Sequence, residues 1–239
     1  MNLVIDCGNT RCKWAIFDDN DLVHQHIEDA QLFGLFDYLA QSPAVKFALL
    51  SNVKTLNDVI LSSLETCVKL LILDHTLQLP FINKYSTPET LGSDRLASVA
   101  GAIALHKKEH VLVIDAGTCI KYEVINANGE YLGGAISPGI QMRFNALHHY
   151  TEKLPLLDPN KDNVLIGNST YGSIQSGVMN ACLAEVDGMI DKYKEILPAP
   201  TVLLTGGDSH FFEGTLKNRI FAVPHLTLIG LNEILRCNE

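Results

Sequence analysis

The sequence lacks the features that would place this chain in a membrane or in two common nucleotide-binding classes. No stretch reaches the roughly 18 uninterrupted apolar residues that a membrane helix needs, although 47% of the residues are hydrophobic. The N-terminus has no basic signal segment, so we expect a cytoplasmic protein with no membrane role. Neither a G-x-G-x-x-G after a strand nor a G-x-x-x-x-G-K-S/T is present, which argues against Rossmann and P-loop folds.

Positive charge is also scarce. The chain has 18 Lys and Arg residues against 27 Asp and Glu residues, which gives a formal charge of −9. A general nucleic-acid surface needs clustered basic residues, so we expect no nucleic-acid partner. An anionic ligand would have to be held by turn amides, by Mg²⁺ and by a few basic residues such as Lys13 and Arg95.

The six cysteines show no metal-binding spacing. None forms C-x-x-C, and Cys7 and Cys12 would stand on opposite arms of one hairpin, without a second Cys or His pair to complete a zinc site. Scattered cysteines in a cytoplasmic chain are expected to be reduced thiols. The nine histidines are dispersed as well, so the sequence predicts no zinc centre.

What the sequence does contain is a short stretch near its start that combines an acid, a glycine and a threonine. The apolar run 3–5 leads into Asp6, followed by Gly8 and Thr10 and by a second apolar run over 12–17. This pattern predicts a buried strand, a tight turn and an antiparallel return strand. Gly8 would let the backbone approach a ligand, and turn amides can hold phosphate oxygens. Asp6 is placed to hold Mg²⁺ through water.

The same pattern occurs again about a hundred residues later. The apolar run 111–114 leads into Asp115, Gly117 and Thr118, and a return strand follows over 119–125. One such pattern is weak evidence for a nucleotide site, but two copies indicate two related halves facing each other across a cleft.

The remaining segments complete the duplicated pattern. The first half reads as strands over 3–6, 12–17, 21–26, 45–51 and 68–73, helices over 33–41 and 56–64, a loop over 78–90 and a helix over 96–106. The second half adds strands over 131–136, 202–205 and 221–224 and helices over 140–149, 171–194 and 225–237. We therefore predict an α/β fold with two ribonuclease-H-like (actin-like ATPase) domains, residues 1–100 and 101–239. Each repeats a β-β-β-α-β-α core, and the nucleotide cleft lies between them.

Three local signals allow two interpretations each. Gly133-Gly134 in a strand marks a bulge or a close backbone approach. Gly206 and Gly207 are either an ordinary turn after a strand or a flat floor for an aromatic ring. In one interpretation of the third signal, Ser93 or Asp94 is a helix N-cap and Arg95 lies on the surface. In the other, Asp94 and Arg95 serve a function.

Taken together, the motifs resemble those of type III pantothenate kinase, within the acetate and sugar kinase, heat-shock-protein-70 and actin superfamily. The resemblance spans nearly the whole chain. It rests on Asp6-Cys7-Gly8-Asn9-Thr10, Gly92-Ser93-Asp94-Arg95, Asp115-Ala116-Gly117-Thr118, Gly133-Gly134-Ala135-Ile136-Ser137-Pro138-Gly139, Thr170 before a helix, and Thr205-Gly206-Gly207-Asp208.

This resemblance implies ATP-dependent phosphorylation of pantothenate to 4′-phosphopantothenate, the first step of coenzyme A biosynthesis. Asp94 is then the general base that takes the proton of the primary alcohol. Arg95 is a natural partner for the pantothenate carboxylate. The full set implied to bind the substrate is Tyr85, Gly92, Ser93, Asp94, Arg95 and Thr170.

The resemblance also assigns the nucleotide and its ions. Asp6 is expected near Mg²⁺, Asp115 is the matching ligand for a monovalent cation (K⁺ or NH₄⁺), and the family forms a homodimer. The residues implied to bind ATP, the co-substrate, are Asp6, Cys7, Gly8, Asn9, Thr10, Arg11, Cys12, Lys13, Thr118, Gly206 and Gly207. One departure is Cys119, where the family often has a hydroxyl or small residue.

Two classes of alternative remain. Another small-molecule kinase of the superfamily would usually have a longer chain with insertions. A non-catalytic relative of the accessory transcription factor type would not need an intact set of catalytic residues. This chain retains that set, namely Asp6, Asp94, Asp115, Thr118 and Arg95.

Overall fold

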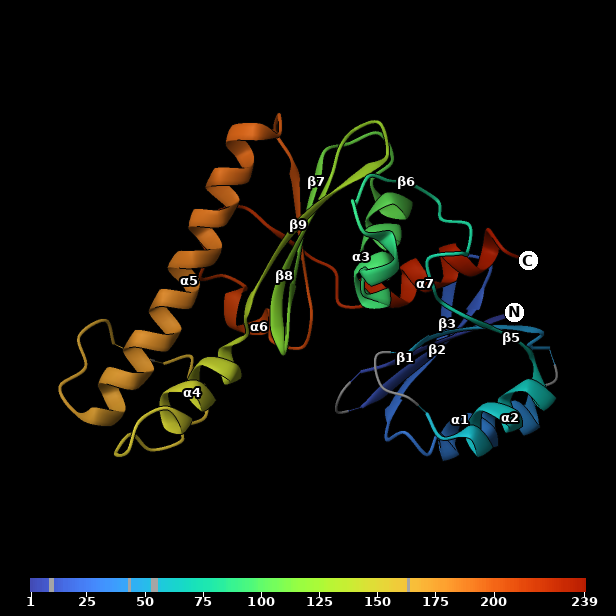
Figure 1. Ribbon diagram of the computed structural model, residues 1–239, viewed down its shortest axis with the longest axis horizontal. Coiled ribbons are helices and arrows are strands. Elements are labelled where there is room, and N and C mark those ends of the chain that lie inside the picture. Colours follow the sequence, from blue (N-terminus) through green and yellow to red (C-terminus); the bar gives the residue numbers. More distant parts are fainter. Residues whose placement is uncertain (9–10, 43, 53–55, 163) are drawn as a thin grey trace. The chain divides into compact units, whose positions relative to one another are not determined.

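The computed structural model describes residues 1–8, 11–42, 44–52, 56–162 and 164–239 (Figure 1). Its contacts group the chain into two compact units. Unit 1 comprises Met1–Lys108, Gly129–Leu132 and His225–Glu239, and unit 2 comprises Glu109–Asn128 and Gly133–Pro224. This grouping differs from the predicted division into 1–100 and 101–239, chiefly because the C-terminal segment belongs with unit 1. The predicted α/β class is confirmed.

Unit 1 is built on a five-stranded sheet in the order β3-β2-β1-β4-β5. The three N-terminal strands pair antiparallel, and β1 with β4 and β4 with β5 pair in parallel. The predicted sequence of three strands, helix, strand, helix and strand is therefore confirmed. The strands are β1 (Asn2–Cys7), β2 (Cys12–Asp18), β3 (Asp21–Glu28), β4 (Phe47–Asn52) and β5 (Lys69–Ile72).

Two hydrophobic cores follow from the alternation of side chains along the strands of unit 1. Leu3 and Ile5 face a cluster that includes Trp14 and the buried residues of α1 (Phe33–Gln41) and α2 (Asp58–Cys67). Val4, on the opposite face of β1, is also fully buried. That face is covered by α7 (Leu226–Arg236), which packs on β1, β4 and α3 (Ser93–Leu105).

The crossing of α3 and α7 depends on two glycines. A Cβ atom at Gly230 would lie 1.8 Å from the carbonyl oxygen of Ala97, and one at Gly101 would lie 2.2 Å from the carbonyl oxygen of Leu226. Backbone atoms cannot move aside as a flexible side chain can. The two helices therefore pack backbone to backbone, which explains why the C-terminal helix belongs to unit 1.

Gly230→Ala is expected to destabilise the protein by about 1–3 kcal/mol because the added methyl group forces α3 and α7 apart. Urea unfolding followed by far-UV circular dichroism measures the change. Gly188→Ala is the matched control, since Gly188 is also helical but a Cβ there meets no atom within 4 Å. The control should be neutral or more stable by up to about 1 kcal/mol, as alanine favours helix. Equal stability of the two variants would contradict the tight crossing.

Unit 2 contains the strands of a second sheet in the order β11-β10-β7-β8-β9. β7 and β8 form the predicted antiparallel hairpin, and β10 pairs in parallel with both β7 and β11. Within unit 1, the first residues of β9 pair in parallel with β6. β6 lies within the segment 78–90 that was predicted to be a loop. The bounds are β6 (Ile82–Asn83), η1 (Pro88–Thr90), β7 (Val111–Ala116), β8 (Cys119–Ile125), β9 (Glu130–Pro138), β10 (Thr201–Thr205) and β11 (Phe221–Ala222).

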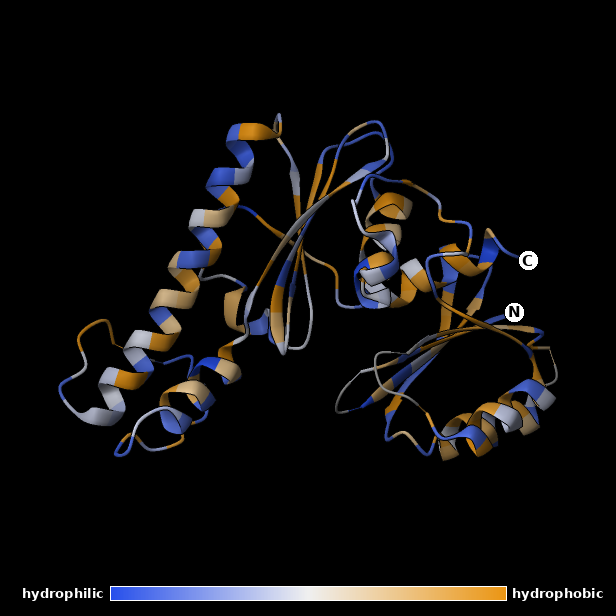
Figure 2. Ribbon diagram, in the orientation of Figure 1, coloured by the Kyte–Doolittle hydropathy of each residue, from blue (hydrophilic) through white to orange (hydrophobic). Residues whose placement is uncertain are grey.

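The core of unit 2 lies between its sheet and the long helix α5 (Thr170–Ile196). Buried residues of β7 and β8 contact Val178, Cys182 and Val186 of α5, together with α4 (Ile140–His149) and α6 (Ser209–Phe212). Figure 2 shows mainly hydrophobic residues along β7, whereas α5 carries both hydrophobic and hydrophilic residues, as a surface helix should. Among the residues that the structure describes, no helix is both long and apolar enough to span a membrane.

Candidate active site

The first predicted phosphate loop lies in unit 1 at the β1–β2 turn. Gly8 donates its backbone N–H to the carbonyl of Arg11 at 3.1 Å, which closes the turn. Asp6 on β1 stands directly opposite Lys13 on β2, so the side chains of this acid and this lysine share one face of the hairpin. Asn9 and Thr10, both predicted to bind ATP, lie outside the described residues.

The expectation of six reduced thiols is wrong for one pair. Cys7 and Cys12 oppose each other in the β1–β2 ladder, with Cα atoms 4.1 Å apart, and form a disulfide. Both are almost completely buried in the core of unit 1, which makes a nucleotide contact through their side chains implausible. Their predicted ATP contacts would therefore have to come from the backbone. The free thiols among the described residues are Cys67, Cys119, Cys182 and Cys237.

The predicted general base lies in the first turn of α3. Gly92, not Ser93 or Asp94, is the N-cap, which corrects the predicted capping role. The Asp94 Oδ1 atom accepts the backbone N–H of Arg95 at 2.9 Å. A Cβ at Gly92 would lie 2.6 Å from that same oxygen, so glycine leaves room for the carboxylate.

A hydroxyl pair connects α3 to β4, the strand next to the one that carries Asp6. The Ser51 hydroxyl donates to the Ser93 hydroxyl at 3.0 Å, and Ser51 is fully buried at the end of β4. Ser51 is also the register partner of Asp6 in the parallel β1–β4 pair. The first turn of α3, with Asp94, is therefore held beside the carboxyl end of β1 within unit 1. Sequence reasoning did not identify Ser51, because nothing near it in the chain marks it.

Two of the predicted substrate residues contact each other. The guanidinium carbon of Arg95 lies 5.3 Å from the ring centre of Tyr85, and Nη1 donates to the Tyr85 hydroxyl at 3.5 Å. Tyr85 in turn stacks on the buried Tyr131 at 6.1 Å. Arg95 is only 6% exposed, so it is not the surface arginine of the alternative interpretation. This stacking fixes a planar donor group near Asp94.

The second acid–glycine–threonine turn lies in unit 2 and is organised differently. Asp115 on β7 is opposite Lys121 on β8, and Lys121 Nζ lies 2.6 Å from Asp115 Oδ2. The predicted ligand for K⁺ is thus in contact with a lysine ammonium. The spacing from acid to lysine differs by one residue between the two motifs, so Lys13 and Lys121 correspond in the hairpin register and not in the sequence. Thr118 is exposed in the turn, as a phosphate contact requires.

The Pro-Gly end of β9 braces this turn. Gly139 donates its N–H to the Thr118 carbonyl at 3.1 Å, and a Cβ at Gly139 would lie 2.1 Å from the Gly117 carbonyl oxygen. The glycine therefore allows two backbone segments to touch. Gly134 does the same for β8, since a Cβ there would lie 1.6 Å from the Tyr122 carbonyl oxygen, which confirms the predicted close approach.

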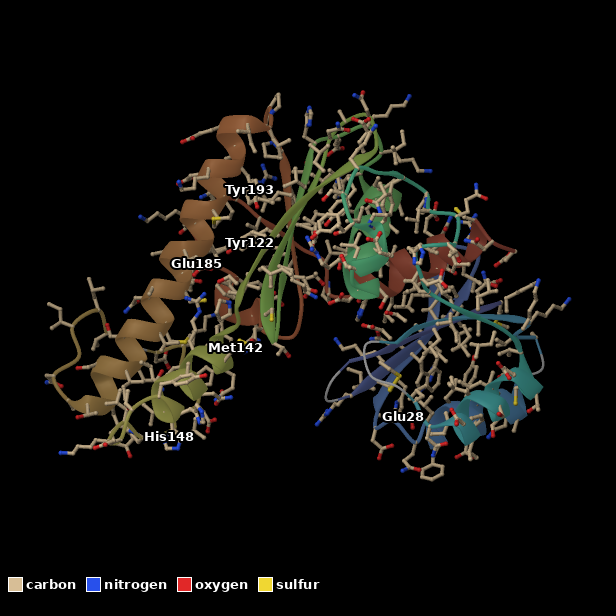
Figure 3. The ribbon with its side chains drawn as sticks, viewed as in Figure 1. Glu28, Tyr122, Met142, His148, Glu185 and Tyr193 are labelled. Atoms are coloured by element: carbon tan, nitrogen blue, oxygen red, sulfur yellow. A yellow bond between two sulfur atoms is a disulfide. The ribbon has the colours of Figure 1, made fainter. Side chains whose placement is uncertain are left out.

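A partly buried hydrogen-bond network joins the same segment to α4 and α5; Figure 3 labels one of its members, Glu185 of α5. Arg143 donates to the Ser137 hydroxyl at 2.8 Å, to the Pro138 carbonyl at 2.9 Å and to the Glu185 carboxylate at 2.6 Å. Burial raises the pKa of the nearby Tyr122 phenol, and the Glu185 carboxylate raises it further, so the phenol stays neutral. Sequence reasoning missed Arg143 and Glu185, which meet only through the packing of the two helices.

Gly206, predicted to floor the adenine pocket, has a φ of +96° and lies against Ala116 and Asp115. A side chain there would be strained and would collide with the Ala116 carbonyl oxygen at 2.1 Å. Asp208 donates its N–H to that same carbonyl at 2.9 Å, which closes the turn after β10. Burial raises the pKa of the Asp208 carboxyl group, an effect that His210 partly opposes.

Thr170, the remaining predicted substrate residue, is the first residue of α5 and follows the N-cap Ser169. It lines a groove of about 940 Å³ between α4 and α5, together with Arg143 and mostly apolar side chains. Tyr150 and Tyr171 nearby are largely exposed. The structure therefore gives Thr170 an apolar setting in unit 2, while Asp94, Arg95 and Tyr85 gather in unit 1.

These two units, each with an acid–glycine turn at a strand end, define the fold of the acetate and sugar kinase, heat-shock-protein-70 and actin class. Solved structures agree. The chain resembles an inorganic polyphosphate/ATP-glucomannokinase from Arthrobacter sp. strain KM (TM-score 0.53, 14% identity, 99% and 98% of the two chains covered). It also resembles a candidate Baf family transcriptional activator from Campylobacter jejuni (TM-score 0.65, 21% identity, 99% and 98% covered).

Sequence comparison identifies the particular family. The family model for type III pantothenate kinase matches residues 2–192. The type III pantothenate kinase of Christiangramia forsetii is 44% identical, with 100% of this chain and 99% of the relative covered. That of Flavobacterium johnsoniae is 39% identical, with 98% and 96% covered. The chain belongs to the type III pantothenate kinase family.

Proposed function

We propose that this chain phosphorylates pantothenate with ATP to give 4′-phosphopantothenate, the first step towards coenzyme A. The observation that carries the proposal is the first turn of α3, where Asp94 is held beside the carboxyl end of β1 by the Ser51–Ser93 pair. A family kinase needs one positioned carboxylate for its alcohol substrate, and this arrangement supplies it in a unit whose core fixes both elements.

Asp94 acts as the general base in this proposal. Its carboxylate accepts the proton of the pantothenate hydroxyl as that oxygen attacks the γ-phosphorus and ADP leaves. The backbone N–H of Arg95 donates to Asp94 Oδ1 and so orients the carboxylate. Phosphoryl transfer has little covalent chemistry for the protein to perform, so orientation and charge neutralisation supply most of the rate.

Arg95 binds the pantothenate carboxylate. A guanidinium group pairs with a carboxylate through two parallel hydrogen bonds, which fixes the orientation of the substrate as well as its charge. The stacking on Tyr85 limits the freedom of this side chain before the substrate arrives. Gly92, Ser93 and Thr170 complete the proposed substrate set, and Gly206 and Gly207 form the proposed adenine floor.

Asp6 is the proposed Mg²⁺ residue. Mg²⁺ in kinases usually keeps several waters and takes its other ligands from one or two carboxylates and the phosphates. A single acid at the end of β1 fits this pattern. When bound, Mg²⁺ supplies charge neutralisation at the phosphates. Lys13 and the amides around Gly8 and Thr118 are proposed to contact the phosphates.

The monovalent cation is a different case. The residue that matches the family ligand, Asp115, is already paired with the ammonium of Lys121. A K⁺ ion and an ammonium group would compete for one carboxylate, so the residues present do not fit a separate monovalent cation here.

We also propose a homodimer formed through the apolar surface near Thr170. The segment between α4 and α5 exposes several large hydrophobic side chains, a pattern typical of interaction sites. Light scattering during size-exclusion chromatography should give the mass of two chains, and Leu165→Asp together with Ile166→Asp should give that of one. Dimers of the double variant would place the interface elsewhere. The exposed residues are Tyr150, Leu156, Val164, Leu165, Ile166 and Tyr171.

The test of the reaction is an ADP-release assay with ATP, Mg²⁺ and pantothenate. Release that depends on pantothenate would support the proposal. Release with a sugar or acetate in place of pantothenate would keep the phosphoryl transfer and reject the substrate. No release with any acceptor would favour a non-catalytic role. The cytoplasmic location expected from the sequence stays a prediction.

A further inference from the structure

The Asp115–Lys121 pair has no role in the function proposed so far. The two residues are directly opposite in the β7–β8 ladder, so their side chains project from the same face of the sheet. The distance of 2.6 Å from Nζ to Oδ2 is that of a direct, charge-assisted hydrogen bond. The side chains are only 15% and 13% exposed, so water screens the pair weakly.

The other side of the Asp115 carboxylate is bordered by backbone. A Cβ at Gly206 would lie 2.6 Å from Asp115 Oδ1, and Thr205 on β10 is the register partner of Asp115. The carboxylate is therefore held between the β10 turn and the lysine ammonium. The lysine occupies the side from which a cation would approach Oδ2.

We propose that the Lys121 ammonium replaces the monovalent cation at Asp115, and that this enzyme consequently turns over without added K⁺ or NH₄⁺. The inference rests on the proposed kinase function. An ammonium group carries the same single positive charge as K⁺ and donates hydrogen bonds as NH₄⁺ does. Because it is tethered to β8, it does not diffuse away from the carboxylate as a free cation does.

Charge repulsion supports the replacement. A second cation beside Asp115 would lie close to the Lys121 ammonium in a poorly hydrated site, where like charges repel strongly. In the other half of the chain, Lys13 is the register partner of Asp6 in the β1–β2 hairpin. Each of the two duplicated turns thus carries its own positive charge.

The first test compares turnover with Na⁺ and with K⁺ as the only monovalent metal ion. The native enzyme should be equally active in both. Lys121→Thr removes the charge and introduces a β-branched residue that favours the strand. This variant should lose about a hundredfold in Na⁺, as when one fixed electrostatic contact is removed. K⁺ or NH₄⁺ should restore much of that loss. Lys192→Thr, at an exposed position of α5, should behave as the native enzyme in both salts.

A second measurement does not depend on turnover. Thallium(I), which replaces K⁺ at protein sites, should give a bound NMR signal with Lys121→Thr and none with the native protein. K⁺ should likewise raise the melting temperature of the variant more than Na⁺ does, and should not do so for the native protein.

The outcomes separate this inference from the kinase proposal. Strong K⁺ stimulation of the native enzyme, or specific thallium binding to it, would overturn the replacement by Lys121 and leave the kinase function standing. Loss of activity in Lys121→Thr without rescue or ion binding would also overturn it, since the lysine would then be a purely structural partner. If the native protein releases no ADP under any condition, the kinase proposal fails, and the thallium comparison still decides the ion site.

Discussion

Asp94→Asn should lower kcat by about 10²–10⁴-fold, the usual contribution of a positioned general base. The amide oxygen of asparagine can still accept the N–H of Arg95, so the first turn of α3 should keep its geometry. What the substitution removes is the ability to take a proton from the substrate. Steady-state ADP release measures kcat, and binding of a fluorescent ATP analogue shows whether the nucleotide site is intact.

Asp58→Asn is the matched control. Asp58 is likewise an acid in the first turn of a helix of unit 1, but it is exposed on α2. Its replacement should leave kcat unchanged. If Asp94→Asn retained the native rate, Asp94 could not be the base, and another acid near the carboxyl end of β1 would have to be considered.

Arg95→Met should lower kcat/KM for pantothenate by about 10²–10³-fold, mainly through KM. This loss equals about 2.7–4.1 kcal/mol, which lies within the roughly 2–5 kcal/mol lost when one partner of a buried, hydrogen-bonded charge pair is removed. Methionine keeps much of the length but loses the guanidinium group that contacts Tyr85, so a neutral substrate is needed to separate the charge from the stacking. The neutral alcohol analogue of pantothenate, which lacks the carboxylate, should be a poor substrate of the native enzyme. The variant should use pantothenate and this analogue equally well.

Arg219→Met provides the control for arginine stacking as such. The guanidinium carbon of Arg219 lies 4.9 Å from the ring centre of Phe221, but this arginine is exposed in unit 2. Its replacement should not change kcat/KM. An Arg95→Met variant that discriminated between pantothenate and the neutral alcohol as the native enzyme does would assign the carboxylate to another residue.

The β1–β2 and β7–β8 hairpins could be predicted from the sequence because their signals are local. An apolar run, an acid and a glycine within eight residues specify a strand and a tight turn whatever the rest of the chain does. The same holds for the amphipathic helices α1, α2 and α5, and for Gly134, whose position inside a strand indicated close backbone packing. The duplicated motif indicated two related halves, the order of the elements indicated the fold class, and the resemblance of several motifs indicated the family.

Local signals did not place the site residues relative to one another. Ser51 meets Ser93 because β4 pairs with β1 and α3 begins beside their ends. Arg95 meets Tyr85 because the segment after β6 returns to α3. The N-cap at Gly92 depended on the same packing, which a sequence preference for serine or aspartate does not encode.

The sequence by itself determined the family and the candidate site residues, because the short motifs that carry the family resemblance can be recognised without the fold. Only the tertiary structure decided which of them are partners. The register of β7 against β8 sets Lys121 at Asp115, and the glycines of α3 and α7 bring the C-terminal helix back to the first unit. Register and helix crossing are fixed by contacts between distant segments, and so the local pattern of residues does not contain them.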